Sequence, residues 1–114
     1  MDSSEDLFIL WTNSNVTTSQ LTIMMYSTNS KIHHWWKNVT VIIWGDTARL
    51  AAENETIQEY IKIAQNVGVK FSACLSCANQ LGVTEKLRKQ DIEVKYWGKP
   101  LTDLLKNKEN LITI

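Results

Sequence analysis

The chain has 114 residues, of which 44% are hydrophobic and 21% charged, and its formal net charge at pH 7 is zero. This length fits one domain over residues 1–114. No basic run indicates nucleic-acid or anionic membrane binding, and no apolar run approaches the roughly 20 residues that cross a bilayer. We expect neither nucleic acid nor membrane as a partner.

Five short apolar runs predict β-strands. They lie at residues 7–11, 39–44, 69–74, 92–97 and 111–114. The second run is nearly all apolar, which is typical of a central strand covered on both faces. The fourth run alternates apolar and polar residues, so we expect it nearer an edge of the sheet.

Apolar residues at helical spacing predict helices between these strands. The first stripe consists of Leu21, Met24, Met25, Thr28 and Ile32. The second consists of Ile57, Tyr60, Ile61, Ala64 and Val67, followed by Gly68. Short helices are expected near Ala78 and after Thr84, and Pro100 suits the first turn of a last helix.

Alternation of strands and helices predicts a parallel sheet with right-handed crossovers. The expected fold is therefore α/β: a five-stranded, mainly parallel, flavodoxin-like sheet with helices on both faces. In such sheets ligands and chemistry lie at the carboxyl ends of the strands, which meet at one edge.

Eight residues that end or follow the predicted strands are candidates for lining a site at this carboxyl edge. They are Trp11, Asn13, Trp44, Gly45, Asp46, Thr47, Trp97 and Lys99. The three tryptophans either wall an apolar cleft or pack in the core or against another subunit. The loop 45–47 is either an anion-binding turn or an ordinary one.

Both cysteines of the chain, Cys74 and Cys77, lie in a C-x-x-C motif at the end of the third predicted strand. Backbone N–H groups at a helix start favour a thiolate, so Cys74 is the candidate nucleophile. Strand alternation places Cys74 on the same side as Lys70 and Ser72, and Cys77 lies one helical turn further on. Both are candidate catalytic residues.

Other interpretations of the motif stay open. Free cysteines are often buried structural residues. A zinc site needs about four ligands, and His33 and His34 are expected at the opposite edge of the sheet, so we predict no metal site within one chain. A thioredoxin-type pair is the third alternative, although Leu75 and Ser76 separate the cysteines and no cis-proline is apparent.

Several other classes of site leave no trace in the sequence. We find no Ser-His-Asp order, paired-carboxylate device or H-E-x-x-H motif, and no glycine-rich nucleotide fingerprint. We therefore predict no cofactor and no hydrolase activity. Two cysteines and an acidic N-terminus without a basic signal region predict a protein of the reducing cytoplasm.

Three segments between residues 39 and 114 are distinctive: V-I-I-W-G, G-V-x-F-x-A-C-x-x-C-A-x-x-L-G-V and I-E-V-K-Y-x-G-x-P-L-T. With them the chain resembles the small single-domain DsrE/DsrF-like proteins. The resemblance implies a parallel α/β domain, homo-oligomers such as trimers or hexamers, and sulfur-donor and sulfur-acceptor protein partners. It also implies a persulfide on the cysteine that matches Cys74, and it assures no role for Cys77.

Three functions remain open at this point. The first is a cytosolic persulfide carrier or sulfurtransferase-type relay, with Cys74 as acceptor and Cys77 as auxiliary or resolving thiol. The second is a non-catalytic oligomeric module that binds a small ligand or partner through the tryptophans. The third is a redox or metal switch built on the C-x-x-C pair.

Overall fold

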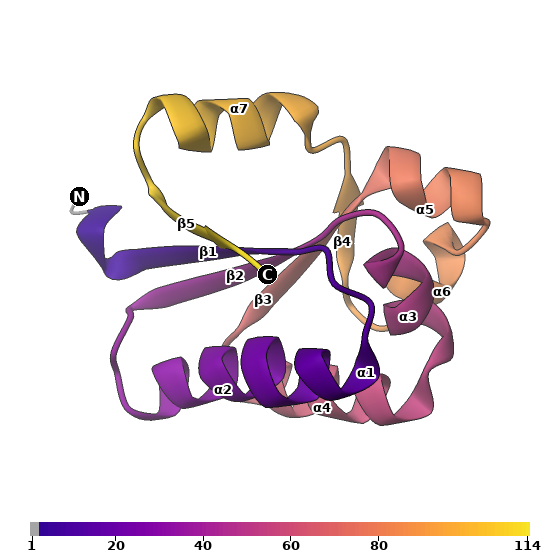
Figure 1. Cartoon of the computed structure of the whole chain (residues 1–114), viewed down its shortest axis with the longest axis horizontal. Coiled ribbons are helices and arrows are strands. Elements are labelled where there is room, and N and C mark those ends of the chain that lie inside the picture. Colours follow the sequence, from indigo (N-terminus) through magenta and orange to yellow (C-terminus); the bar gives the residue numbers. More distant parts are fainter. Residues whose placement is uncertain (1–2) are drawn as a thin grey trace.

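The computed structural model describes residues 3–114 and confirms the predicted α/β fold. Five parallel strands form one sheet in the order β4-β3-β2-β1-β5 (Figure 1). The strands are β1 (Asp6–Trp11), β2 (Asn38–Ile43), β3 (Lys70–Cys74), β4 (Glu93–Lys95) and β5 (Asn110–Thr113). As expected, β2 is central and β4 lies at an edge.

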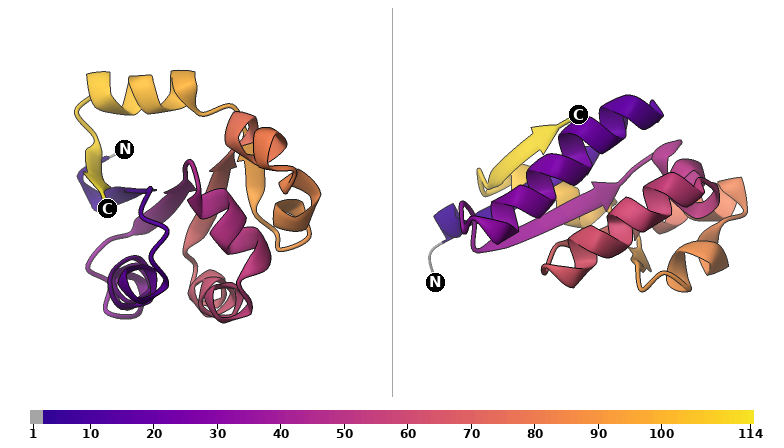
Figure 2. Two further views of the ribbon diagram at one scale, coloured as in Figure 1. Left: turned by 45° about the vertical axis from the view of Figure 1, so that its right-hand side comes forward. Right: turned by 90° about the horizontal axis from the view of Figure 1, so that it is seen from below.

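Helices cover both faces of the sheet, but unequally. The helical segments are η1 (Ser3–Glu5), α1 (Val16–Thr18), η2 (Ser19–Met24), α2 (Met25–Ile32), α3 (Thr47–Glu53), α4 (Glu55–Asn66), α5 (Leu75–Leu81), α6 (Thr84–Arg88) and α7 (Gly98–Lys106). The continuous helix α1–η2–α2 lies beside α4 on one face, whereas α7 crosses the other face (Figures 1 and 2).

Strand alternation divides the apolar core into two clusters. Ile9, Val41 and Phe71 belong to the larger cluster, under η2, α3 and α4. Ile42 belongs to the smaller cluster on the opposite face, together with Leu101 and Leu104 of α7. Because β2 contributes buried residues to both clusters, its nearly continuous apolar sequence is explained.

The first helix forms where expected, but the predicted apolar stripe is not its buried face. Leu21, Met25 and Ile32 are exposed, whereas Ile23 and Met24 are buried. The buried face is completed by small residues: Ser19, Ser27 and Ser30. The segment η2 is π-helical, and its wider turn shifts the phase of every later side chain relative to the 3.6-residue period. The period therefore predicted the wrong face.

The fourth strand is shorter than its alternating sequence predicts. Only Glu93–Lys95 pairs with β3, and Trp97 has already left the strand to become the N-cap residue of α7. The Trp97 side chain is 5% exposed and packs between the sheet and α7. Because this large indole is buried under α7, the chain leaves the β3–β4 pairing before the end of the predicted strand at residue 97.

The C-terminal strand closes the sheet against the N-terminal one. β5 pairs in parallel with β1, with Leu7 opposite Asn110 and Leu10 opposite Thr113. Beyond the strand, the Ile114 N–H donates to the Leu10 carbonyl at 2.9 Å, and the Ile114 carbonyl accepts from the Thr12 N–H at 2.7 Å. The end of β1 is thus held by residues that come last in the chain.

None of the helices within residues 3–114 has both the length and the apolar character that a membrane crossing requires.

Candidate thiol site

The C-x-x-C motif forms the junction between β3 and α5. Cys74 is the last residue of β3 and the N-cap of α5, with the extended backbone that this position requires (φ −70°, ψ 117°). Helix α5 ends at Gly82, whose φ of 71° is the left-handed conformation that glycine adopts most readily. Cys77 therefore lies one turn into a well-delimited helix, at the carboxyl edge of the sheet.

The Cys74 side chain is buried on the α7 face of the sheet. Its exposed fraction is only 5%, and it belongs to the apolar cluster that contains Ile42 and Trp97. This burial means that a reagent reaches the Cys74 sulfur only after α7 or Trp97 moves. The predicted nucleophile is thus the less accessible of the two thiols.

Cys77 is half-buried and borders solvent. The Gly45 N–H, in the loop after β2, donates a hydrogen bond to the Cys77 Sγ at 3.3 Å. Gly45 has a φ of 73°, and an added Cβ would meet no atom within 4 Å, so glycine is needed there for its conformation. A shallow pocket of about 260 Å³ lies over the thiol, lined by Gly45, Asp46, Gln80 and Leu81.

The surroundings of Cys77 act in opposite directions on its ionisation. Burial raises the pKa of the Cys77 thiol, the Gly45 N–H lowers it, and the neighbouring Cys74 thiol raises it again. The net direction is upward, so at neutral pH Cys77 is mainly the protonated thiol. Both cysteines are free, and both belong to the same apolar cluster, so the two side chains are neighbours.

Of the three strand-end tryptophans, the structure brings two together with the cysteines. Trp44 and Trp97 pack in the same apolar cluster as Cys74 and Cys77. Trp11 does not belong there, because it shares the β1 face of Leu7 and Ile9 and is fully buried under η2. Its indole N–H lies 3.0 Å from both the Ser19 hydroxyl and the Asn13 carbonyl, so Trp11 is a core residue and not a wall of the thiol site.

Two polar candidates after β1 and β2 have structural roles. The buried Thr47 hydroxyl donates to the Trp11 carbonyl at 2.8 Å and accepts from the Trp44 N–H at 3.1 Å, which ties the ends of the two strands together. The Asn13 side chain accepts from the Asn15 N–H at 2.9 Å and so closes the turn before α1. These contacts give neither residue a role in thiol chemistry.

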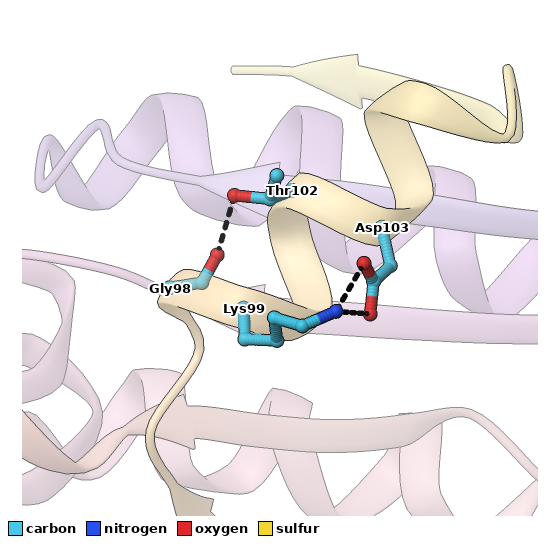
Figure 3. Close-up of polar contacts among 4 residues, drawn as sticks. All are labelled: Gly98, Lys99, Thr102 and Asp103. Carbon is cyan, nitrogen blue, oxygen red and sulfur yellow. Dashed lines mark hydrogen bonds and ion pairs between the residues drawn. The ribbon is translucent and has the colours of Figure 1, made fainter.

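The charged candidates of the carboxyl edge pair with neighbours on their own helices. Asp46 forms an ion pair with Arg49 across the first turn of α3. Lys99 reaches both carboxylate oxygens of Asp103, at 2.7 and 2.9 Å, on the outer surface of α7 (Figure 3). The Thr102 hydroxyl donates to the Gly98 carbonyl in the same turn (Figure 3). Asp46 also borders the pocket over Cys77, whereas Lys99 is committed to its helix.

Three polar residues near the cysteines were not singled out as site candidates from the sequence. The Trp97 indole N–H donates to the buried Ser72 hydroxyl at 2.8 Å, and that hydroxyl donates to the Glu93 carboxylate at 2.7 Å. Lys95 lies opposite Cys74 in the β3–β4 ladder, with its Nζ 4.7 Å from the Trp97 ring centroid. The alternation of β4 places Glu93 and Lys95 on one face, but only the strand register shows that this face is that of Cys74.

The histidines lie far from the cysteines in the fold. His33 caps the end of α2 and stacks on Trp35 with ring centroids 5.2 Å apart, and His34 has a positive φ of 57°. Within residues 3–114, no three His, Cys, Asp or Glu side chains form a group suited to a metal ion. Among these residues, no third His, Cys, Asp or Glu side chain joins the two thiols in the kind of group that zinc takes.

Comparisons with known proteins place the chain beside one solved structure. No protein-family model matches it, and no curated protein matches it. The solved structure is that of BT1422, a conserved protein of unknown function from Bacteroides thetaiotaomicron. The TM-score is 0.97 at 36% sequence identity, over 100% of this chain and 98% of the other. With that identity over its whole length, the chain belongs to the same family as this conserved protein of unknown function.

Proposed function

We propose that the protein is a carrier of sulfane sulfur, a sulfurtransferase-type relay of the DsrE/DsrF-like kind. The observation that carries the proposal is the pair of neighbouring free thiols at the carboxyl edge of a parallel sheet, one of them open to a pocket. The amide of Gly45 supports it, because its N–H lowers the pKa of Cys77 and so partly offsets the larger effect of burial, which raises it.

The transfer needs only a donor and an acceptor. The Cys77 thiolate attacks the outer sulfur of a persulfide donor, R–S–SH, and the donor's S–S bond breaks as the new one forms. The leaving thiolate takes up the proton that Cys77 lost, so R–SSH and Cys77–SH become R–SH and Cys77–S–SH. An acceptor thiolate then removes the same sulfur by the reverse exchange.

Burial favours different roles for the cysteines from those expected from the sequence. Cys77 is the thiol that a donor reaches, and Cys74 lies behind it under Trp97. Attack of the Cys74 thiolate on the inner sulfur of the Cys77 persulfide would form a Cys74–Cys77 disulfide and release hydrosulfide. Cys74 is accordingly the resolving thiol, and burial slows that discharge.

Intact-mass spectrometry after incubation with a persulfide donor tests the proposal. We expect wild type and Cys74→Ser to gain one sulfur atom and Cys77→Ser to gain none, with Cys74→Ser holding the sulfur longer than wild type. The double variant is the control for non-specific uptake. A wild-type protein that gains no sulfur contradicts the proposed function, and one that forms only an internal disulfide identifies a redox switch instead. Uptake that depends on Cys74 alone would restore the roles expected from the sequence.

The proposal includes a cytosolic setting and assembly into a homo-oligomer, a trimer or a hexamer. Support comes from the apolar side chains exposed on neighbouring helices: Leu21, Met25, Ile32 and Ile63. Light scattering is expected to give three or six times the 13.1 kDa of one chain, and Met25→Glu is expected to lower that mass. A wild-type mass of 13.1 kDa would contradict the assembly but not the thiol chemistry.

A further inference from the structure

The α7 face of the sheet is divided into an apolar half and a polar half. The apolar half, under α7, is formed by Phe8, Leu10, Ile42 and Leu111. The polar half, over β2, β3 and β4, carries Thr40, Lys70, Ser72, Glu93 and Lys95. Parallel sheets are normally buried on both faces by apolar contacts, so an open polar half is unusual.

A hollow of about 640 Å³ lies over this polar half and extends past the short β4 to α4, whose residues also line it. Phe8, Thr40 and Lys70 line it from the sheet. Trp97 lines the hollow and packs in the same apolar cluster as Cys74. The volume is within the roughly 300–1,000 Å³ of small-molecule sites. Polar groups on its floor and aromatic rings at its sides are the mixture that such sites use to orient a ligand.

The wall of the hollow is held in place before any ligand arrives. The Trp97 indole is fixed by its hydrogen bond to Ser72, which in turn is bound to Glu93. The Lys95 Nζ lies 3.5 Å from the Glu93 carboxylate and over the Trp97 ring. Because these groups satisfy one another, their orientation costs little further entropy when a ligand binds.

The remaining charges of the hollow favour an anion. Glu93 and Lys95 neutralise each other. Within residues 3–114, Lys62, Lys70 and Asp91 also line the hollow and have no ion-pair partner. These three leave one uncompensated positive charge, and Lys70 lies on the floor, beside Thr40 in the strand register.

We propose that the hollow binds a small organic anion with a planar apolar body. The anionic group pairs with Lys70, and the planar body lies against Phe8 and Trp97. This site is distinct from the thiol pair, and no step of the proposed sulfur transfer uses Lys62, Lys70 or Asp91, so the two proposals can fail independently.

Two fluorescent probes of similar shape and different charge test the site. We expect the anionic probe 8-anilinonaphthalene-1-sulfonate to bind with one-to-one stoichiometry and to shift the amide NMR signals of Thr40, Lys70 and Ser72 and the Trp97 indole signal. The uncharged probe N-phenyl-1-naphthylamine is expected to bind at least about tenfold more weakly, because it lacks the charged partner for Lys70.

Matched variants locate the binding and complete the test. Lys70→Ala is expected to weaken binding of the sulfonate about tenfold, whereas substitution of another exposed lysine, Lys106→Ala on α7, leaves it unchanged. Thr40→Phe places a phenyl ring on the floor of the hollow and is expected to weaken binding of the sulfonate without changing a charge. The proposal is overturned if the sulfonate does not bind, if both lysine variants bind alike, if the uncharged probe binds as tightly, or if the NMR shifts fall on the exposed face of α2.

Discussion

Trp97→Ala is expected to lower the free energy of unfolding by about 3–5 kcal/mol, the usual cost of removing a buried aromatic side chain. The indole is 5% exposed and fills the space between the sheet and α7 beside Ile42 and Cys74. Its loss also leaves the buried Ser72 hydroxyl without the donor at 2.8 Å. Equilibrium urea unfolding, followed by far-ultraviolet circular dichroism, measures the difference.

Two controls separate packing from the other effects of this substitution. Tyr96→Ala removes a neighbouring aromatic ring that is 67% exposed, and its effect should stay within about 0.5 kcal/mol. Ser72→Ala removes the hydrogen bond while keeping the indole, with an expected cost of about 1 kcal/mol. If Trp97→Ala costs no more than Ser72→Ala, the packing role assigned to Trp97 is wrong.

Alkylation by iodoacetamide is expected to be about a hundredfold faster at Cys77 than at Cys74 in the folded protein. Cys77 borders a pocket, whereas Cys74 needs a local opening, and an opening of about 2.7 kcal/mol reduces a rate a hundredfold. Timed quenching and mass spectrometry of Cys74→Ser and Cys77→Ser give the two rates separately.

We also expect the rate of alkylation at Cys77 to depend on pH differently from that of an ordinary thiol. Because burial raises the pKa of Cys77, the folded protein holds less thiolate at neutral pH than the unfolded chain does. The rate should therefore keep increasing at pH values where an ordinary thiol has levelled off, and urea should raise the neutral rate. Both thiols should react equally in urea, which serves as the control. A faster rate at Cys74 in the folded state would reverse the assigned roles.

The parts of the fold that follow from short-range periodicity were predictable. The continuous apolar run of β2 and the alternation of β4 correctly indicated a central and an edge strand. The buried face of the first helix was not predictable, because the π-helical turn at Ser19–Met24 breaks the period on which the interpretation relied. The predicted length of β4 was also wrong, because the strand ends where Trp97 is buried, and that burial depends on α7, a later segment of the chain.

The location of the candidate site was predictable from the sequence, whereas the roles of its two thiols were not. The strand assignments located Cys74 and Cys77 at the carboxyl edge, beside Trp44 and Trp97. The position of α7 on the sheet determines which of the two thiols is exposed. The residues around the cysteines do not reveal that position. The hydrogen bond from Gly45 joins residues that are 32 positions apart, so no motif around the cysteines reveals it.

The pairing of β5 with β1 has a consequence for how the chain acquires its structure. Thr12 and the residue whose carbonyl it binds, Ile114, are 102 positions apart, so this contact closes a very long loop. During synthesis the outer edge of β1 stays open until residues 110–113 are available, and before then α7 is held only by the packing of its own apolar side chains, such as Leu101 and Leu104. The thiol pair and the polar hollow, which both depend on α7 or Trp97, are therefore among the last features of the molecule to form.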